Sequence, residues 1–411
     1  MRIVTIVLCI AAAGVVGAQK SAVTPPHVVT APPRADANAK TPGIPGLPGP
    51  RLKLVEARAI AGKKESLEGD IAVDLGPRGL TVIRSGGRMM KAYDSTGRRL
   101  WTMDRNRDGE IGDVTAIGWR GDEMWVSDRR FSQIALVDKG VVATSLELPS
   151  WVRPSWSNRK NFPVFGTLDV YAFFSDGSMT GVPRRAHSIV GTVGYDSTMQ
   201  YVLHVSESGI VDRAIAKFPS SDFAARAEWS RAVGDRADRI PSPWLLVEDF
   251  WPRLRISPDG QRTVVVTVDT SHGVTDSIGV AAVNTTGTPV FARAIGLPRM
   301  SYSESQIDSI AAVRFRGATG EYRAQRVRSL PRMVAAVRDV TLGHDYSVWV
   351  TLRETDGGAK PIVGIDAAGN IIGTIYLPRT LQLKAADRGV LWIVDYGSTF
   401  RDVVRYTIGN P

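Results

Sequence analysis

The stretch Val114–Leu148, VTAIGWRGDEMWVSDRRFSQIALVDKGVVATSLEL, decides the fold. It contains four short runs rich in Val, Ile, Leu and Trp, and turns containing Gly or Asp separate them, which is typical of antiparallel strands. The expected strands are Val114–Trp119, Met124–Ser127, Gln133–Val137 and Val141–Leu146. The stretch is therefore a predicted four-stranded antiparallel unit.

The same unit recurs along the chain, and two alternating series of turns mark its copies. The turns of the first series are Gly76–Gly79, Arg120–Asp122, Ser175–Gly177, Pro258–Gly260, Gly343–Asp345 and Asp387–Gly389. Those of the second series are Asp94–Gly97, Asp138–Gly140, Ser206–Gly209, Asn284–Gly287 and Asp366–Gly369. The unequal series predict a unit that occurs six times, of which the last copy lacks its own fourth strand.

The run Arg51–Ile60 could supply that missing strand. Pairing it with the last unit would close the sheets into a ring and remove the exposed sheet edges that promote aggregation. We therefore predict an all-β fold over residues 51–411, a six-bladed β-propeller of four-stranded blades closed by the N-terminal strand. A β-sandwich is the alternative, because sandwiches also have short strands at regular spacing.

Long connections occur only between the second and third strands of a unit or between units. They are 148–165, 183–197, 218–251 and 298–332. Both kinds of connection emerge on the same face of a propeller, and we expect binding on this long-loop face because elaborate loops on a rigid scaffold usually carry function. Two short helical insertions are predicted within them, at Ser221–Val233 and from Ser303 onward.

The first 50 residues are predicted to form a secretory signal followed by a tether. Residues 1–18 combine a positive charge, an apolar run and small residues placed for cleavage, which is typical of a secretory signal. Residues 19–50 are rich in Pro, Gly, Ala and Thr and predict a disordered tether. We expect a secreted or periplasmic protein with no transmembrane segment in the mature chain. The only cysteine, Cys9, lies in the signal, so no disulfide or thiolate chemistry is expected afterwards.

The net charge of +10 suggests contact with anionic envelope surfaces. Nucleic acid is not an expected partner, because no recognition helix, zinc finger or aromatic RNA-binding motif accompanies the arginines. We expect a monomer, although the sequence leaves the oligomeric state open.

Two segments resemble known exported propellers. Met124–Asp128 followed by Gln133–Asp138 is similar to the core of an NHL repeat. Pro252–Gly260 resembles the strand-and-turn signature of bacterial exported six-bladed propellers of the TolB-like kind. The resemblance covers about residues 51–411 and implies a propeller fold, and it mostly leaves function unassigned. The helical insertions and an irregular third unit depart from the NHL pattern.

Catalytic motifs for serine hydrolases, zinc proteases, nucleotide or dinucleotide binding are absent from the sequence, and no cofactor is expected. The mouth of the central channel would be approached by residues at the starts of blades and after second strands. They are Asp70, Asp113, Arg253, Arg332, Asp128, Asp269 and Asp395. This mixture of acids and arginines is as suited to ion pairs or an anionic ligand as to a metal.

Three further features have a functional and a structural interpretation. Asp104–Ile111 resembles the first part of a calcium loop, but Thr115 stands where an acidic ligand should complete it, which favours an ordinary turn. The arginines between residues 314 and 332 are either an anionic-partner site or a solvated face. His204 lies mid-strand, where a structural, hydrogen-bonded role is the default.

The leading hypothesis is an exported propeller that binds a protein, glycan or envelope component through its long-loop face, without catalysis. The alternative is a metal-dependent hydrolase or lactonase with a site at the channel mouth. The sequence identifies no ligand.

Overall fold

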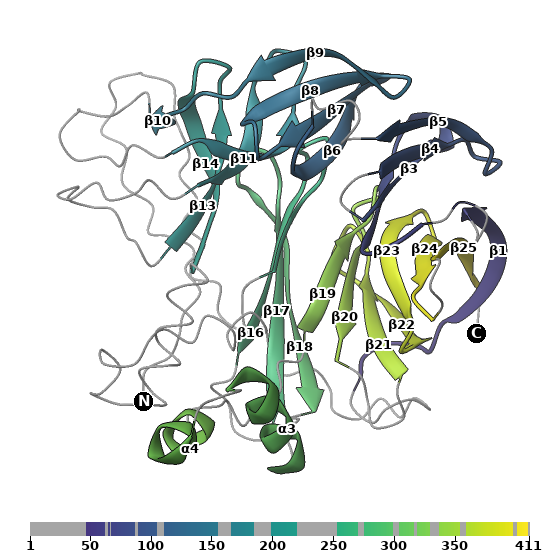
Figure 1. Ribbon diagram of the computed structural model, residues 1–411, viewed down its shortest axis with the longest axis vertical. Helices are drawn as coiled ribbons and strands as arrows, with labels where there is room; N and C mark the ends of the chain where they lie inside the picture. The colour runs from purple at the N-terminus through teal and green to yellow at the C-terminus, as the bar shows by residue number, and fades with distance from the viewer. Residues whose placement is uncertain are drawn as a thin grey trace.

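The computed structural model describes residues 47–61, 65, 67–86, 89–104, 111–154, 166–184, 199–219, 253–269, 275–298, 304–315, 319–328, 337–353, 359–397 and 401–409. The described strands form six antiparallel sheets around a ring (Figure 1). The protein is a six-bladed β-propeller, as the sequence predicts. We number the blades in chain order and write the strands of each from the channel outward.

The first three blades come from the N-terminal half of the chain. Blade 1 comprises β2 (Ile71–Leu75), β3 (Thr81–Ser85), β4 (Met89–Tyr93) and β5 (Arg99–Asp104). Blade 2 comprises β6 (Val114–Arg120), β7 (Glu123–Asp128), β8 (Gln133–Asp138) and β9 (Val141–Glu147). Blade 3 comprises β11 (Leu168–Phe173), β12 (Met179–Pro183), β13 (Met199–Val205) and β14 (Ile210–Pro219), with the short β10 (Arg153–Pro154) added outside β14.

The other three blades complete the ring. Blade 4 comprises β15 (Arg253–Ile256), β16 (Thr263–Asp269), β17 (Thr275–Val283) and β18 (Pro289–Pro298). Blade 5 comprises β19 (Val337–Leu342), β20 (Val348–Leu352), β21 (Ala359–Ile365) and β22 (Ile371–Pro378). Blade 6 comprises β23 (Leu381–Asp387), β24 (Val390–Asp395), β25 (Asp402–Gly409) and β1 (Lys53–Ala61).

The N-terminal strand closes blade 6. β1 pairs antiparallel with β25, from Lys53 opposite Gly409 to Ala61 opposite Val403. β23 of this blade contacts β2 of blade 1, so that the last blade also meets the first. The predicted closure by residues near the N-terminus is confirmed.

A separate apolar core fills each of the six junctions between neighbouring blades. In the core between blades 2 and 3, the fully buried Trp125 meets Phe173 edge to face, with ring centroids 6.4 Å apart. The Trp125 ring also covers the backbone of Gly118, where an added Cβ would lie 2.3 Å from the nearest ring atom. The large Trp ring therefore needs a glycine on the neighbouring strand.

The fourth strands of blades 1 to 5 share a β-bulge close to their start. Each has one residue too many opposite the third strand, and these residues are Leu100, Ala143, Asp212, Val290 and Ile372. A bulge increases the local right-handed twist of a strand. The repeated bulge thus adds twist at the same place in five blades, and the sequence analysis missed it.

Two outer strands are covered by extended segments of the chain itself. β10 pairs parallel with the start of β14. Residues 47–52 run along β22, where the Leu52 and Thr374 amides donate to the carbonyls of Thr374 (2.9 Å) and Pro50 (2.8 Å). The end of the predicted tether therefore caps the outer edge of blade 5.

The helical insertion between blades 4 and 5 contains α3 (Glu304–Arg314) and α4 (Gly320–Arg328). The two helices share a small core of Ile307, Ala311, Phe315 and Val327. The helix predicted from Ser303 onward is confirmed, whereas α4 was missed because its mostly charged sequence lacks an apolar period. The other predicted helix, Ser221–Val233, lies outside the described residues. No helix among the described residues is long and apolar enough to cross a membrane.

Cross-linking β1 to β25 tests the ring closure. Val55 and Thr407 face each other across these strands and are 352 residues apart in the chain. In a Val55→Cys, Thr407→Cys variant, we expect oxidation to raise the free energy of unfolding by up to about 5 kcal/mol, because a disulfide over so long a loop restricts the unfolded chain strongly. Urea denaturation of the oxidised and reduced forms measures the difference.

A cysteine pair within one blade is the matched control. Gln133 and Glu147 also face each other, across β8 and β9, but enclose only a hairpin. Oxidation of the Gln133→Cys, Glu147→Cys pair should stabilise the protein by no more than about 3 kcal/mol. An equal or larger gain from the hairpin pair would contradict closure by β1.

Candidate functional site

The long connections meet on one face. Antiparallel pairing places the start of each innermost strand and the end of each second strand at the same end of a blade. The connections from second to third strands and those between blades therefore share the long-loop face. The short turns of the two repeated series occupy the opposite, plain face.

Arginines tie neighbouring blades together beside the channel. Arg84 on β3 donates to the Asp74 carboxylate (2.9 Å) and to the carbonyl of Val114 in blade 2 (3.2 Å). Arg255 on β15 similarly donates to the carbonyl of Val340 (2.6 Å) in blade 5. Innermost strands have an unpaired edge toward the channel, and an arginine from the preceding blade supplies a donor to that edge at both junctions.

Carboxylates form ion pairs between neighbouring blades at three junctions. Asp339 of blade 5 pairs with Arg255 of blade 4 (2.6 Å). Asp169 of blade 3 pairs with Arg184 (2.6 Å) and with Arg129 of blade 2 (3.5 Å). Asp70 at the start of blade 1 accepts from Lys384 of blade 6 at 3.3 Å.

Asp70 is the predicted site residue with the clearest electrostatic environment. Its desolvation opposes ionisation, but the Lys384 ammonium and the Tyr396 hydroxyl together hold the pKa of the Asp70 carboxyl below its ordinary value. Tyr396 donates to the Asp70 carboxylate (3.1 Å), and its oxygen also accepts from the Ile71 amide. Lys384 is the extra residue of a bulge in β23. Asp70 thus links the last blade to the first.

Asp128 organises the loop that follows β7. Its carboxylate is fully buried and accepts the backbone amides of Gly112 (2.6 Å), Asp113 (3.0 Å), Arg130 (2.9 Å) and Phe131 (3.4 Å). A buried carboxylate with four donors is well satisfied. The sequence places Asp128 among the ligand-binding candidates, and the structure gives its carboxylate the role of fixing the loop.

The loop fixed by Asp128 presents Arg130 and Phe131 to solvent. The Phe131 side chain is 46% exposed, and the Arg130 guanidinium lies 5.4 Å from its ring centroid. At its other end the loop is held by Ser132, whose carbonyl accepts the Leu148 amide (2.8 Å) and whose hydroxyl accepts from Arg184 (3.2 Å). We name residues 129–132 the blade 2 loop.

Arg130 and Phe131 were not among the functional candidates predicted from the sequence. The signal that could have found them is an aromatic residue within a polar turn, directly after two arginines and between two predicted strands. The ring of Phe131 lies in a turn, where it has no neighbouring strand against which to pack.

Of the remaining predicted site residues, Asp113 lies beside Asp128, to whose carboxylate its amide donates (3.0 Å). Asp113 is exposed, and its backbone carbonyl accepts the Arg129 amide (2.7 Å). Asp395 ends β24 and accepts the Gly397 amide (2.7 Å). Arg253 begins β15 and Asp269 ends β16, whereas Arg332 lies outside the described residues. A binding role for them stays a prediction.

Metal ligands do not converge in the described part of the chain, where no three His, Cys, Asp or Glu side chains form a group that could hold an ion. The calcium-like segment extends from Asp104 over residues 105–110, which lie outside the described ranges. Of the arginine-rich stretch, Arg323 and Arg328 on α4 are exposed.

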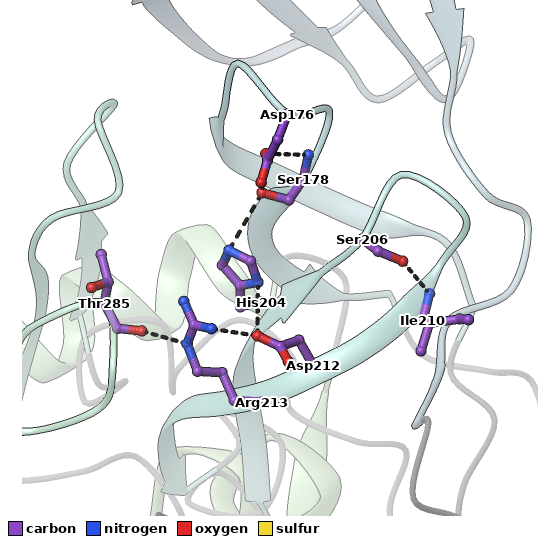
Figure 2. Close-up of polar contacts among 8 residues, drawn as sticks. All are labelled: Asp176, Ser178, His204, Ser206, Ile210, Asp212, Arg213 and Thr285. Carbon is purple, nitrogen blue, oxygen red and sulfur yellow. Dashed lines mark hydrogen bonds and ion pairs between the residues drawn. The ribbon is translucent and has the colours of Figure 1, made fainter. Parts of the chain in front are cut away.

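A serine, a histidine and an aspartate lie close together on blade 3 (Figure 2). The Ser178 hydroxyl is 3.5 Å from Nε2 of His204, and the Asp212 carboxylate is 3.6 Å from Nδ1. Asp212 is the extra residue of the β14 bulge, which aims it at the ring. The arrangement has the residue types of a catalytic triad, so its protons decide its role.

The protons are placed differently from those of a triad. The Ser178 hydroxyl donates to Asp176 (2.6 Å), so the Ser178 oxygen can only accept from Nε2 of His204. Nδ1 of His204 then carries a lone pair and has no hydrogen-bond partner within the described part of the chain. In a triad the histidine instead accepts from the serine and donates from Nδ1 to the aspartate.

Blade 5 repeats the same serine turn without a histidine. There the Ser347 hydroxyl donates to Asp345 (2.6 Å) and accepts from the indole N–H of Trp349 (2.9 Å). The Asp–Ser pair therefore stabilises turns on the plain face of the propeller. This agrees with the structural role predicted for His204.

Comparison with known proteins leaves the family open. No family model matches the chain, and no curated protein matches it. Among solved structures, BamB from Moraxella catarrhalis is 11% identical, with 82% of this chain and 85% of that chain covered and a TM-score of 0.30. BBS1N in complex with ARL6DN is also 11% identical, with coverages of 87% and 98% and a TM-score of 0.37. Because both TM-scores are below 0.5, the fold rests on the strand pairing.

Removing the Asp128 carboxylate should destabilise the blade 2 loop. In Asp128→Ala, four backbone amides lose their buried acceptor, and we expect the free energy of unfolding to fall by about 3 kcal/mol or more. Urea denaturation measures the loss. Asp122→Ala is the control: it removes an exposed ion pair with Arg78 on the plain face and should cost less than about 1 kcal/mol. Equal losses in the two variants would contradict the role of Asp128.

His204 makes stability depend on pH. Burial, followed by the Arg213 guanidinium, holds the pKa of His204 below its ordinary value of 6.5, although Asp212 and Asp176 oppose the shift. The unfolded chain therefore binds the proton more readily, and the free energy of unfolding should fall as pH drops below about 6.5, by at most about 1.4 kcal/mol per pH unit.

The His204→Gln variant should have a flatter pH profile than the wild type between pH 6.5 and the lowered pKa. Thermal denaturation across this range measures the slope. His344→Gln, which replaces an exposed histidine and keeps His204, should retain the slope of the wild type. A wild-type slope in His204→Gln would show that another group is responsible.

Proposed function

We propose that this protein is a binding propeller that engages a protein partner through its long-loop face, with the blade 2 loop as a principal contact. The observation that carries the proposal is the buried Asp128, which accepts four amides and thereby fixes a loop whose Arg130 and Phe131 side chains face solvent.

The chemistry of this loop suits a protein interface. Arginine and large aromatic side chains are enriched among the residues that contribute most to binding energy. A loop that is already ordered loses little conformational entropy when a partner binds. The fixed blade 2 loop therefore combines suitable side chains with a low ordering cost.

The paired charges beside the channel support a scaffold without catalysis. Asp74, Asp169 and Asp339 each pair with an arginine beside a blade junction, and Asp70 pairs with Lys384. Their ion pairs link or brace the blades. We therefore propose the loops around the mouth as the contact.

The location of the partner follows from the predicted signal in residues 1–18. A chain with such a signal would meet its partner in the periplasm or outside the cell. The proposed partner is therefore a protein of the envelope or the exterior, and an envelope glycan is the other class that the experiment distinguishes.

A photo-crosslinking amino acid at position 131 tests the proposal. We expect crosslinking in intact cells to give an adduct of discrete mass, which protease treatment removes if the partner is a protein and a glycosidase removes if it is a glycan. The same amino acid at position 122, which is exposed on the plain face, should give no such adduct. Adducts from position 122 and none from 131 would contradict the proposal.

The affinity for the crosslinked partner, once purified, should fall at least about tenfold in Phe131→Ala, because truncating an aromatic contact residue typically costs more than 1 kcal/mol. Isothermal titration calorimetry measures it. Asp122→Ala should bind like the wild type.

A further inference from the structure

The outermost strand of blade 2 leaves an open sheet edge. β9 lies at the periphery of the ring, outside β8 (Figure 1). Six of its seven residues are exposed, and no described segment pairs with its outer edge. An open edge of this kind can add a strand from another chain, and proteins usually protect such edges.

The other five outer strands are covered or interrupted. β14 and β22 are capped by β10 and by residues 50–52. Among the uncapped strands, β18 begins and ends with proline, whereas β1 contains Lys53 and Glu56. β5 begins with Arg99 and ends with Asp104. β9 instead has a run of uncharged, proline-free residues from Val141 to Leu146, which is the longest such run among the uncapped outer strands.

Exposed apolar side chains gather at the same edge. Four of the seven large apolar side chains that are exposed in the described chain lie on β9 or beside its end: Val141 (68% exposed), Leu146 (36%), Phe131 (46%) and Trp151 (59%). Phe131 lies near the C-terminal end of β9 but on its β8 side, because the Leu148 amide binds the Ser132 carbonyl there, so the outer strand itself carries Val141 and Leu146. An apolar edge of this kind indicates a surface that is covered in the working molecule.

The charges at the two ends of β9 identify the occupant. Lys139 precedes the strand and Glu147 ends it, and neither forms an ion pair among the described residues. When two copies of β9 pair antiparallel with Lys139 of one copy opposite Glu147 of the other, Val141 lies opposite Ser145 and diagonal to Glu147, and Leu146 lies diagonal to Val142. The strand is thus complementary to itself in charge and in apolar character.

We propose that β9 pairs antiparallel with β9 of a second copy of this chain and forms a two-fold symmetric dimer with a continuous sheet across blade 2. An added strand can pair beside a bulge, because β10 pairs with Ile210 and Val211 before the bulge at Asp212, and residues 50–52 pair at Thr374 after the bulge at Ile372. We therefore place the β9 pairing in the segments on either side of the bulge at Ala143. The sequence alone predicts a monomer, and the open edge changes that expectation.

Sedimentation velocity of the full chain over a range of protein concentrations tests the dimer. We expect the wild type to shift from monomer to dimer as concentration rises, and Val141→Glu to weaken the dimer at least tenfold, because it places a carboxylate diagonal to Glu147 of the other copy. A wild type that stays monomeric at several hundred micromolar would overturn the proposal and leave the edge to a different protein.

Charge reversal distinguishes antiparallel β9 pairing from any other dimer. Lys139→Glu and Glu147→Lys should each weaken association, and the double variant should restore it because the complementary charges meet again. Both positions are exposed, so folding should be unaffected, which circular dichroism checks. Leu100→Lys on β5 is the matched control at another outer edge and should dimerise like the wild type. Unchanged association in both single variants, or no recovery in the double variant, would overturn the pairing.

Discussion

The pairing of β1 with β25 is the constraint on which the ring depends. The C-terminal part of the chain supplies only three strands of blade 6, and residues 53–61 complete it. With this strand in place, blade 6 has the same four-stranded sheet as its neighbours and contributes to the apolar cores on both of its sides. The remaining blades keep their spacing because the ring is closed.

Closure of the ring does not by itself fix neighbouring blades against one another. Two classes of contact between blades do so. Apolar cores fill the six junctions and supply most of the burial. Near the channel, Arg84 and Arg255 each donate to a carbonyl of the following blade and thereby fix the register between neighbouring innermost strands. The long-loop face is built on this frame, so the blade 2 loop is held from below by a rigid sheet and from within by Asp128.

The sequence was sufficient to predict what depends on repetition. The turn series mark the blades, the unpaired run near residue 51 indicates the closing strand, and the distribution of long connections indicates the long-loop face. Properties that arise only when strands pair could not be predicted from the sequence. Asp128 and Asp395 both follow a second strand, but only Asp128 meets the amides of residues 112 and 113, which belong to a different connection.

The positions of the bulges could not be predicted from the sequence for the same reason. A bulge is an extra residue relative to a partner strand, so it is visible only once the register is known, and the alternation of apolar residues does not mark it. Yet bulges aim Lys384 at Asp70 and Asp212 at His204. They therefore decide which polar groups meet, and the part of the site that depends on them could not be predicted from one sequence.

The separation of β1 from β25 also governs how the chain can reach its native state. β1 is synthesised first among the described strands, but its partner follows 352 residues later at the paired positions Val55 and Thr407. Blade 6 therefore cannot form until β25 has been synthesised, and contacts of such long range slow folding. A chain shortened before β25 would retain β1 as a strand without a partner and expose it to aggregation. The closing strand thus acts as a test that the chain has been made as far as β25.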